Sequence, residues 1–315
     1  MADKKLEATR DAYGRVLCEL GKTYPNLIVL DSDLSVSTKT CMFAKQFPGR
    51  FFNAGVAEQD MVSTAAGFAT TGKIVFASTF AVFATGRAWE QVRVSVAYPR
   101  LNVKIVATHG GITTGEDGAT HQATEDIAIM RAIPNMTVIV PCDALEAEKA
   151  IRAVAAVHGP VYVRLSRGKT PVVNKSDYQF KVGKGITLAD GKDLTIIAAG
   201  IMVDMALDAR AELEKEGISS RVINLHTIKP IDKELIAAAA RETGAILTAE
   251  EHSIIGGLGG AVCEVVAENC PVPVTRLGMK DMFGESGKPD DLLEKYGLTS
   301  KEISKAARSL LARKK

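Results

Sequence analysis

The stretch Phe51-Phe52-Asn53-Ala54-Gly55-Val56-Ala57-Glu58-Gln59-Asp60-Met61 joins an apolar run to a glycine and then to a carboxylate. The run predicts a short strand, and the apolar side chains after Glu58 recur at helical spacing. Glu58 therefore stands in the first turn of a helix, where the free N–H groups stabilise a negative charge. That explanation is structural. The functional alternative is a carboxyl group held where strand meets helix and aimed at a ligand.

The composition indicates a two-domain α/β protein. A chain of 315 residues is too long for one ordinary core, and 46% hydrophobic residues with only 5% aromatics suit helices packed on parallel sheets. The net charge of +2 comes from 39 basic and 37 acidic residues, which argues against nucleic acid or a membrane surface as the main partner. Local clusters of arginine or lysine can still bind phosphate.

The cysteines and the termini indicate a cytoplasmic protein. The five cysteines form no CxxC pair, which is typical of reduced thiols. The first residues show no signal peptide, and no apolar segment is long enough to span a bilayer. The histidines have no metal-ligand spacing, so we expect no metal held by this chain. The cysteines are Cys18, Cys41, Cys142, Cys263 and Cys270.

Apolar runs and amphipathic segments alternate through the first half of the chain, which predicts a parallel sheet covered on both faces. The expected helices cover residues 6–20, 40–47, 58–69, 79–96 and 144–157. Besides the run before Gly55, the expected strands cover residues 27–30, 74–77, 103–107, 137–140 and 161–165.

The alternation breaks between residues 168 and 185, where proline, asparagine and charged residues show little periodicity, and then resumes. We therefore predict a first domain at 1–172, a linker at 173–190 and a smaller α/β domain at 191–315. The expected strands of the second domain are 194–197, 220–224, 245–248 and 272–275, and its helices 203–216, 233–241 and 258–268. We expect the tail, 300–315, to be a basic helix exposed to solvent.

Residues 108–122 are the least regular stretch, with four glycines, two histidines and two carboxylates, and they predict a binding loop. A second polar loop, 31–37, follows the strand at 27–30, at the end of a parallel strand where ligands gather. The glycines at 256–260 lack the dinucleotide-binding order, so we interpret them as a close-packed helix start. His226 and His252 are interpreted as satisfied structural histidines.

Five motifs occur in the order found in one enzyme family. Together they resemble the C-terminal half of a transketolase, a thiamine-diphosphate enzyme. The resemblance covers essentially the whole chain. It implies a pyrimidine-binding domain followed by the smaller transketolase C-terminal domain, both α/β with mostly parallel sheets and helices on both faces. The motifs are Gly55–Gln59, Ser78–Phe83, Ala107–His109, Gly115–Gln122 and Leu165–Arg167.

The resemblance assigns Glu58 to the cofactor. In the family a glutamic acid hydrogen-bonds a pyrimidine nitrogen and favours the imino tautomer. Since this role requires a carboxyl group that can hold a proton, we expect burial to raise the pKa of Glu58. Phe80 and Phe83 match the aromatic pair that encloses the pyrimidine, and Asp33 a residue near the cofactor at the dimer interface. Gly86 stands where the family often has a third aromatic.

The resemblance also implies a sugar-phosphate site. His121, and with it His109, takes a catalytic role near the reacting carbonyl, where His121 stabilises oxyanion character. Asp117 reads a neighbouring hydroxyl. The residues expected to meet the sugar phosphate are His109, Arg10, Ser37 and Arg167, arginine being suited to phosphate by its planar fork.

A full transketolase has an upstream half that binds the diphosphate through Mg²⁺, and its motifs are absent here. We therefore expect the C-terminal subunit of a split transketolase of the pentose phosphate pathway. It would homodimerise and pair with an N-terminal subunit as a heterotetramer, two copies of each. The reaction moves a two-carbon ketol unit from a ketose phosphate to an aldose phosphate through a thiamine-diphosphate ylide. Alone, the chain is expected to be inactive.

Two alternatives stay open. The segment Thr248–His252 also resembles deoxyxylulose-phosphate synthase-like and pyruvate-dehydrogenase-beta-like proteins, although the loop with His109 and His121 favours sugar phosphates. The third possibility is a non-catalytic regulatory or assembly subunit. Loss of Glu58 or of both loop histidines would have favoured it, and all three residues are present.

Overall fold

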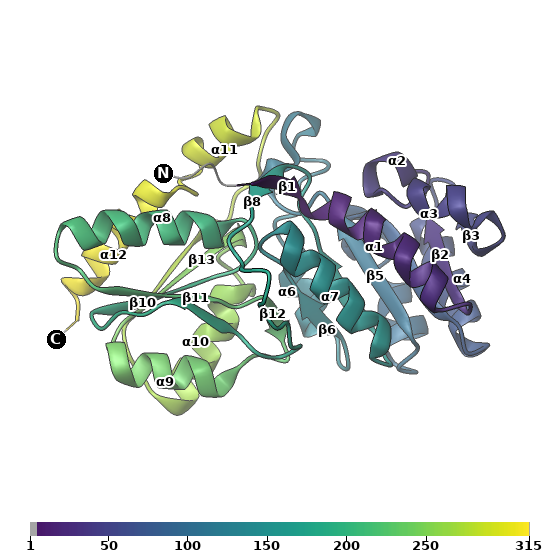
Figure 1. The fold of residues 1–315 in the computed structure, drawn as a ribbon. Helices are drawn as coiled ribbons and strands as arrows, with labels where there is room; N and C mark the ends of the chain where they lie inside the picture. The colour runs from purple at the N-terminus through teal and green to yellow at the C-terminus, as the bar shows by residue number, and fades with distance from the viewer. Residues whose placement is uncertain (1–4, 315) are drawn as a thin grey trace.

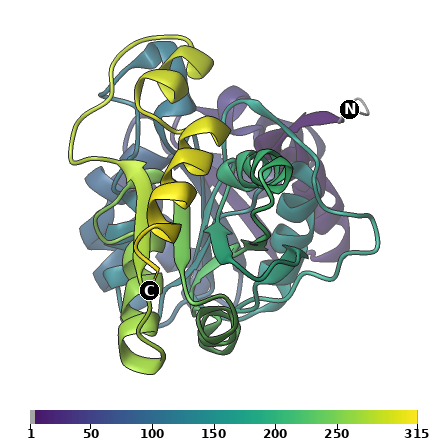
Figure 2. The same ribbon diagram turned by 90° about the vertical axis from the view of Figure 1, so that its left-hand side faces the viewer.

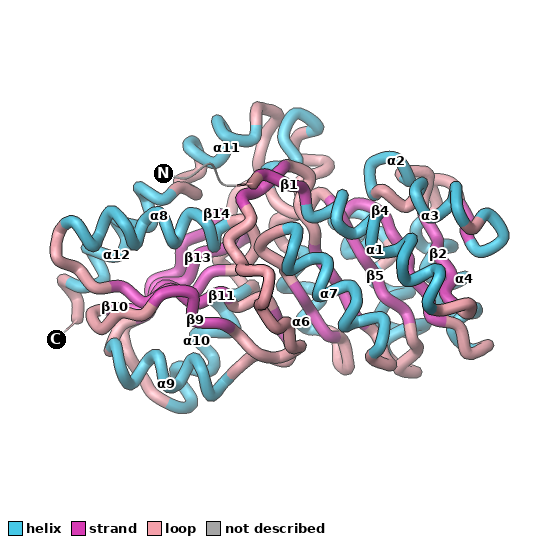
Figure 3. The backbone as a smooth tube through the Cα atoms, viewed as in Figure 1, coloured by secondary structure: helices cyan, strands magenta, loops and turns pink. Residues whose placement is uncertain are grey.

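The computed structural model describes residues 5–314 and shows two sheets lying side by side, each covered by helices (Figures 1 and 3). The larger sheet has the strand order β12-β6-β7-β5-β4-β2-β3, and all its pairings except that of β12 are parallel. Its strands are β2 (Leu27–Asp31), β3 (Phe51–Asn53), β4 (Ile74–Phe80), β5 (Val103–Thr108), β6 (Thr137–Ile139), β7 (Val161–Arg164) and β12 (Thr227–Lys229).

Two apolar layers cover the larger sheet. α1 and α7 lie side by side on one face (Figure 1) and bury aliphatic and aromatic side chains together with α3. α4 and α6 bury theirs on the other face. The helices are α1 (Thr9–Thr23), α2 (Ser35–Thr38), α3 (Cys41–Gln46), α4 (Glu58–Thr70), α5 (Trp89–Gln91), α6 (Asp126–Ala132) and α7 (Ala144–Ala156), with a 3₁₀ turn at Pro48–Arg50.

The smaller sheet has the order β14-β13-β10-β11-β9, with β9 alone antiparallel. α8 and α12 cover one face and α9 and α10 the other; Figure 2 shows the C-terminal helix, in yellow, along this sheet. The elements are β9 (Ile186–Ala189), β10 (Leu194–Ala198), α8 (Met202–Lys215), β11 (Ser220–Asn224), α9 (Lys233–Thr243), β13 (Ile246–Ser253), α10 (Leu258–Asn269), β14 (Val274–Met279), α11 (Pro289–Lys295) and α12 (Ser300–Leu311).

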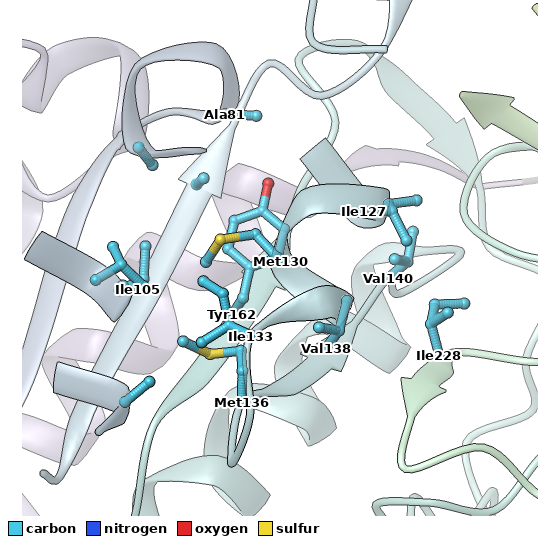
Figure 4. Packing of buried hydrophobic residues seen from close by; sticks show 14 of the residues in the cluster. Ala81, Ile105, Ile127, Met130, Ile133, Met136, Val138, Val140, Tyr162 and Ile228 are labelled. Atoms are coloured by element: carbon cyan, nitrogen blue, oxygen red, sulfur yellow. The ribbon is translucent and has the colours of Figure 1, made fainter. Parts of the chain in front are cut away.

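One strand from the second half of the chain and a shared apolar cluster connect the two sheets. That strand, β12, pairs in antiparallel orientation with β6 of the larger sheet. Its Ile228 packs into the cluster that holds Val138, Val140 and Met130 (Figure 4). Beyond β7, the strand β8 (Lys169–Pro171) turns back to pair with β1 (Leu6–Ala8). The α/β fold class, mostly parallel with helices on both faces, is confirmed.

Several predicted boundaries were wrong because tertiary contacts overrode local pattern. The first helix begins at Thr9, since the residues before it pair with β8. The predicted helix at 79–96 is broken: β4 runs on to Phe80, and two π-helical segments, Phe83–Arg87 and Val92–Ala97, flank α5. The last predicted strand, 272–275, instead runs from Val274 to Met279.

The C-terminal helix is not a purely solvated face. α12 buries Ile303, Ala307 and Leu310 against α8 and the smaller sheet, and its charged residues take the outer side. The glycine-rich segment does start a helix as predicted, with the Glu250 carboxylate accepting from the N–H groups of Leu258 and Gly259. Among residues 5–314, no helix has the length and apolar character needed to cross a bilayer.

Candidate active site

Glu58 is the first residue of α4 and its side chain is buried, with 1% exposed. Gly55 at φ +75 lets the chain turn from β3 into the helix. One carboxylate oxygen of Glu58 accepts from the Thr79 hydroxyl at 3.3 Å, and the other pairs with Nη1 of Arg87 at 2.6 Å. Burial together with a charged partner goes beyond a simple first-turn carboxylate. Arg87 was not foreseen from the sequence.

Phe80 and Phe83 form a stacked pair beside this carboxylate. Their ring planes differ by 11° and their centroids are 5.9 Å apart. Phe80 ends β4 and Phe83 opens the π-helical segment, so the two do not lie on a single helix as the expected helix at 79–96 implied. The guanidinium of Arg87 lies over Phe83, 4.7 Å from the ring centroid. The family often has a third aromatic residue at the position of Gly86. Here the planar guanidinium of the next residue, Arg87, lies over Phe83 instead.

The two loop histidines lie against this aromatic pair. His109 stacks on Phe80 with centroids 3.7 Å apart, and His121 meets Phe83 edge-on at 5.3 Å. Nδ1 of His109 lies 2.8 Å from the Thr108 hydroxyl. Burial first, and then the nearby charges of Arg10, Arg167 and His121, lower the pKa of His109 to about 3. His109 is therefore neutral at physiological pH.

Two arginines converge on the same corner from different elements. Arg10 of α1 donates to the Ser37 carbonyl at 3.0 Å, so the contact uses the backbone of Ser37 and not its hydroxyl. Arg167, just after β7, donates to the Thr114 carbonyl, and its Nη1 lies 3.2 Å from a carboxylate oxygen of Glu116. Burial, with repulsion from Arg167, lowers the pKa of Arg10. Two guanidinium groups that repel each other favour an anion between them.

Asp117 and Asp33 occupy more open positions. A carboxylate oxygen of Asp117 lies 3.7 Å from Nη1 of Arg167, within the binding loop. Asp33, at φ +61, accepts from the Asn53 amide at 3.3 Å, while its own N–H donates to that amide's oxygen at 3.0 Å. Asp33 thus joins the ends of β2 and β3, away from the stacked phenylalanines in its described contacts.

Asp31 is a buried carboxylate to which the sequence analysis assigned no individual role. Its carboxylate accepts from the hydroxyls of Thr38 and Thr40 at 2.7 and 2.9 Å and from the Leu34 N–H at 2.7 Å. These bonds fold the loop that carries Asp33 and Ser37. A carboxylate at the end of an apolar run was the signal available in the sequence.

The binding loop is held in place by the second half of the chain. The Thr113 N–H donates to the Glu251 carboxylate at 2.7 Å, and Gln122 donates its amide to the Glu285 carbonyl at 2.9 Å. Gly111, at φ +84, must lack a side chain, because a Cβ there would lie 2.2 Å from the Glu251 carboxyl carbon. Glu251 lies inside Thr248–His252, the segment that the sequence singled out for another resemblance.

No metal centre is apparent in the part of the chain that the structure describes, where no three His, Cys, Asp or Glu side chains gather as a set of ligands. His226 lies buried, with Nδ1 at 2.8 Å from the Thr227 hydroxyl, and His252 contacts the Ser253 carbonyl at 2.7 Å. The ring of His226 lies against that of Phe180 and His252 lies beside Glu250, so the contacts described for these two histidines do not include Glu58.

Comparison with known proteins defines first the class and then the family. A model for the transketolase pyrimidine-binding domain matches residues 6–172, and a model for the transketolase C-terminal domain matches residues 183–303. Domains of this kind are parts of thiamine-diphosphate-dependent transferases. The chain therefore belongs to the transketolase family and corresponds to its C-terminal section.

Three relatives show how far the similarity extends. A protein of Methanocaldococcus jannaschii, provisionally named a transketolase C-terminal section, is 58% identical over 299 residues and covers 94% of each chain. A Clostridium protein named 6-deoxy-6-sulfo-D-fructose transketolase subunit is 46% identical, covering 97% of this chain and 95% of its own. A solved structure described as a split gene transketolase, inactive beta4 tetramer, matches with TM-score 0.92 and 54% identity over 98% of this chain and 99% of that chain.

Proposed function

We propose that this chain is the C-terminal subunit of a split transketolase, active with an N-terminal partner subunit. The observation that carries the proposal is the corner at which buried Glu58, the stacked pair Phe80 and Phe83, and the histidines His109 and His121 meet. The overall reaction is transfer of a two-carbon ketol unit from a ketose phosphate to an aldose phosphate. The reaction class is that of the transketolase family, and the carboxyl, aromatic and imidazole groups named above are suited to it.

The residues present fit the pyrimidine end of thiamine diphosphate. Phe80 and Phe83 offer nearly parallel apolar rings that can hold a flat heterocycle and exclude water. Glu58 is the buried carboxyl group that would hold a proton against a ring nitrogen. When bound, the cofactor supplies a nucleophilic carbon for cleaving and forming the carbon–carbon bond. In this proposal Asp33 lies at the dimer interface near the cofactor.

The remaining groups suit a phosphorylated sugar. His121 would donate a hydrogen bond to the reacting carbonyl oxygen, and neutral His109 would hydrogen-bond the sugar. The charge of Arg167 repels that of Arg10, and a phosphate bound by both arginines would offset that repulsion. Asp117 would read a hydroxyl, and Ser37 would contribute beside Arg10. The 46% identity to a sulfosugar transketolase subunit favours a family of related sugar substrates over one sugar.

The partner subunit would supply what this chain lacks. We propose that it holds the diphosphate through Mg²⁺ and that two copies of each subunit assemble in the cytoplasm. The neighbour described as an inactive beta4 tetramer supports the view that chains of this kind self-associate without activity. We further propose domains at 1–172 and 191–315 with a linker at 173–190, and a place in the pentose phosphate pathway.

Mixing experiments test the proposal. The chain, a candidate N-terminal subunit, and the two combined are each given thiamine diphosphate, Mg²⁺, a ketose phosphate and an aldose phosphate, and sugar products are measured. We expect turnover only in the mixture. Full activity of the isolated chain would contradict the split-subunit proposal. Pyruvate as the preferred donor would instead support a deoxyxylulose-phosphate synthase-like or pyruvate-dehydrogenase-beta-like function.

A further inference from the structure

Arg87 occupies the Glu58 corner because of an unusual backbone turn. The segment Phe83–Arg87 is π-helical, and the Ala88 N–H bonds to the Phe83 carbonyl five residues back at 3.3 Å. π-Turns of this kind are rare and concentrate at functional sites. The turn places the guanidinium both over the Phe83 ring, at 4.7 Å, and against the Glu58 carboxylate, at 2.6 Å. The guanidinium thereby covers the Phe83 ring of the stacked phenylalanine pair.

The two members of the Glu58–Arg87 ion pair differ in their exposure to solvent. The Glu58 side chain is 1% exposed and that of Arg87 is 46% exposed. A buried carboxylate without a counter-ion is costly, so this pairing stabilises the ionised form of Glu58. The arginine keeps contact with water and can leave the pair without first being desolvated or crossing the core. The carboxylate is therefore the fixed member and Arg87 the movable one.

The other groups that face Glu58 do not replace this charge. From β4, the Thr79 hydroxyl donates to the second carboxylate oxygen at 3.3 Å. Beyond the phenylalanine pair, His121 lies edge-on to Phe83, and His109 stacks on Phe80 and is neutral. Among the ion pairs described for residues 5–314, Glu58 has one, with Arg87.

The ionised state conflicts with the role proposed for Glu58. A pyrimidine ring nitrogen carries a lone pair and accepts hydrogen bonds, and a carboxylate is also an acceptor only. The two can bond only when a proton lies between them. An arginine at 2.6 Å opposes uptake of that proton, because it favours the charged form of the carboxyl group. Cofactor binding must therefore overcome the Arg87–Glu58 pair.

We propose that Arg87 is a displaceable counter-ion that holds Glu58 ionised until the aminopyrimidine enters, and so couples cofactor binding to proton uptake. The inference rests on the proposed function. On binding, Arg87 turns to solvent with its charge unchanged, and one proton from solvent passes to Glu58, which then donates it in a hydrogen bond to the ring nitrogen. Arg87 is thus a positioning residue that sets cofactor affinity and its pH dependence.

The test is calorimetry on the assembled complex of this chain with its N-terminal subunit and Mg²⁺. Thiamine diphosphate is titrated into wild type and Arg87→Met in two buffers of different ionisation enthalpy, which yields the protons taken up per cofactor bound. For wild type we expect uptake close to one proton. For Arg87→Met, which removes the guanidinium that pairs with the Glu58 carboxylate, we expect uptake to fall by more than half and the Kd to tighten by up to about tenfold.

Controls separate this effect from general damage. Arg308→Met removes another arginine–carboxylate pair, that with Glu216 on the second domain, and should leave proton uptake and Kd unchanged. If Arg87→Met fails to assemble on size-exclusion chromatography, Arg87→Gln takes its place with the same expectations. Unchanged proton uptake and Kd in the Arg87 variant would overturn this inference alone. A wild-type complex that binds no thiamine diphosphate would overturn the proposed function as well.

Discussion

Charge at the site is controlled residue by residue through burial. Glu58 and His109 are both nearly inaccessible, yet one carries a counter-ion and the other is kept neutral. The carboxylate gains an arginine that reaches it from solvent, whereas the imidazole lies beside two arginines that repel its charged form. The site thus combines a carboxylate paired with an arginine, Glu58, and a neutral imidazole, His109, which can both donate and accept hydrogen bonds.

Replacing Glu58 tests whether the chain is catalytic. In the assembled pair, Glu58→Ala should lower kcat by roughly a hundredfold or more, because it removes a proton-transfer group. Asp60→Ala is the matched control, since it removes an exposed carboxylate from the same first turn of α4 and should leave kcat nearly unchanged. Full steady-state turnover by the complex assembled with the Glu58→Ala chain would favour the non-catalytic assembly subunit.

His109 should show no titration in the physiological range. Its pKa is lowered to about 3, so the ring stays neutral as the pH falls past about 6.5, where an ordinary histidine becomes charged. Proton NMR of the imidazole C–H signals, assigned by comparison with His109→Gln, measures this directly. A His109 signal that moves with a midpoint near neutrality would contradict the described burial.

At the scale of elements, strand ends and one loop assemble the site. β2, β4, β5 and β7 are parallel neighbours or near neighbours, so their carboxyl ends share one edge of the sheet. The loop at 109–122 lies over that edge and is fastened by Glu251 at the end of β13. Buried Arg164 reinforces the fastening by donating to the Ala123 and Glu251 carbonyls. The smaller domain therefore orders the loop of the larger one.

Removing the Glu251 carboxylate should loosen this loop. Glu251→Ala leaves the Thr113 N–H without its acceptor, which costs on the order of 1–3 kcal/mol locally for a buried donor. We expect amide hydrogen exchange across residues 112–118 to accelerate at least about fivefold, with helices of the larger domain unaffected. Glu264→Ala, which breaks a surface pair with Arg131, is the control. Equal exchange in both variants would argue against the fastening role.

At the scale of the whole molecule, strand pairing and a shared apolar cluster connect the two halves of the chain. β12 completes the larger sheet from the second half of the chain, and β1 and β8 close the first half over the junction. The larger sheet also buries Lys104 of β5, whose ammonium donates to the carbonyls of Val157 and Gly159, each at 2.7 Å. This places a titrating charge within the structure that holds the site.

Lys104 should make the free energy of unfolding depend on pH between about 7 and 10.5. Burial lowers its pKa from 10.5 to about 7, so between these values the unfolded chain binds more protons and stability rises with pH. The rise should reach at most about 5 kcal/mol in the free energy of unfolding. Lys104→Met should lose this pH dependence, while exposed Lys301→Met should retain it. Urea unfolding at several pH values measures it, and parallel curves for wild type and Lys104→Met would refute the prediction.

Much of the fold could be predicted because local patterns and parallel-sheet rules agree. The buried runs at 27–30 and 103–107 became strands, and the junction at Glu58 starts α4 as the pattern indicated. The stacking of Phe80 and Phe83 and their closeness to His109 and His121 agree with the grouping expected from the motifs.

Other features depend on contacts between residues far apart in the chain, which no local pattern encodes. The sequence by itself determined the alternation of strands and helices, the order of the motifs and the identity of the groups able to do chemistry, because these follow from side-chain chemistry and period. Only the tertiary structure decided that Arg87 pairs with Glu58 and that Glu251 fastens the binding loop. Those partners meet through a π-turn and a domain junction, where packing overrides local preference.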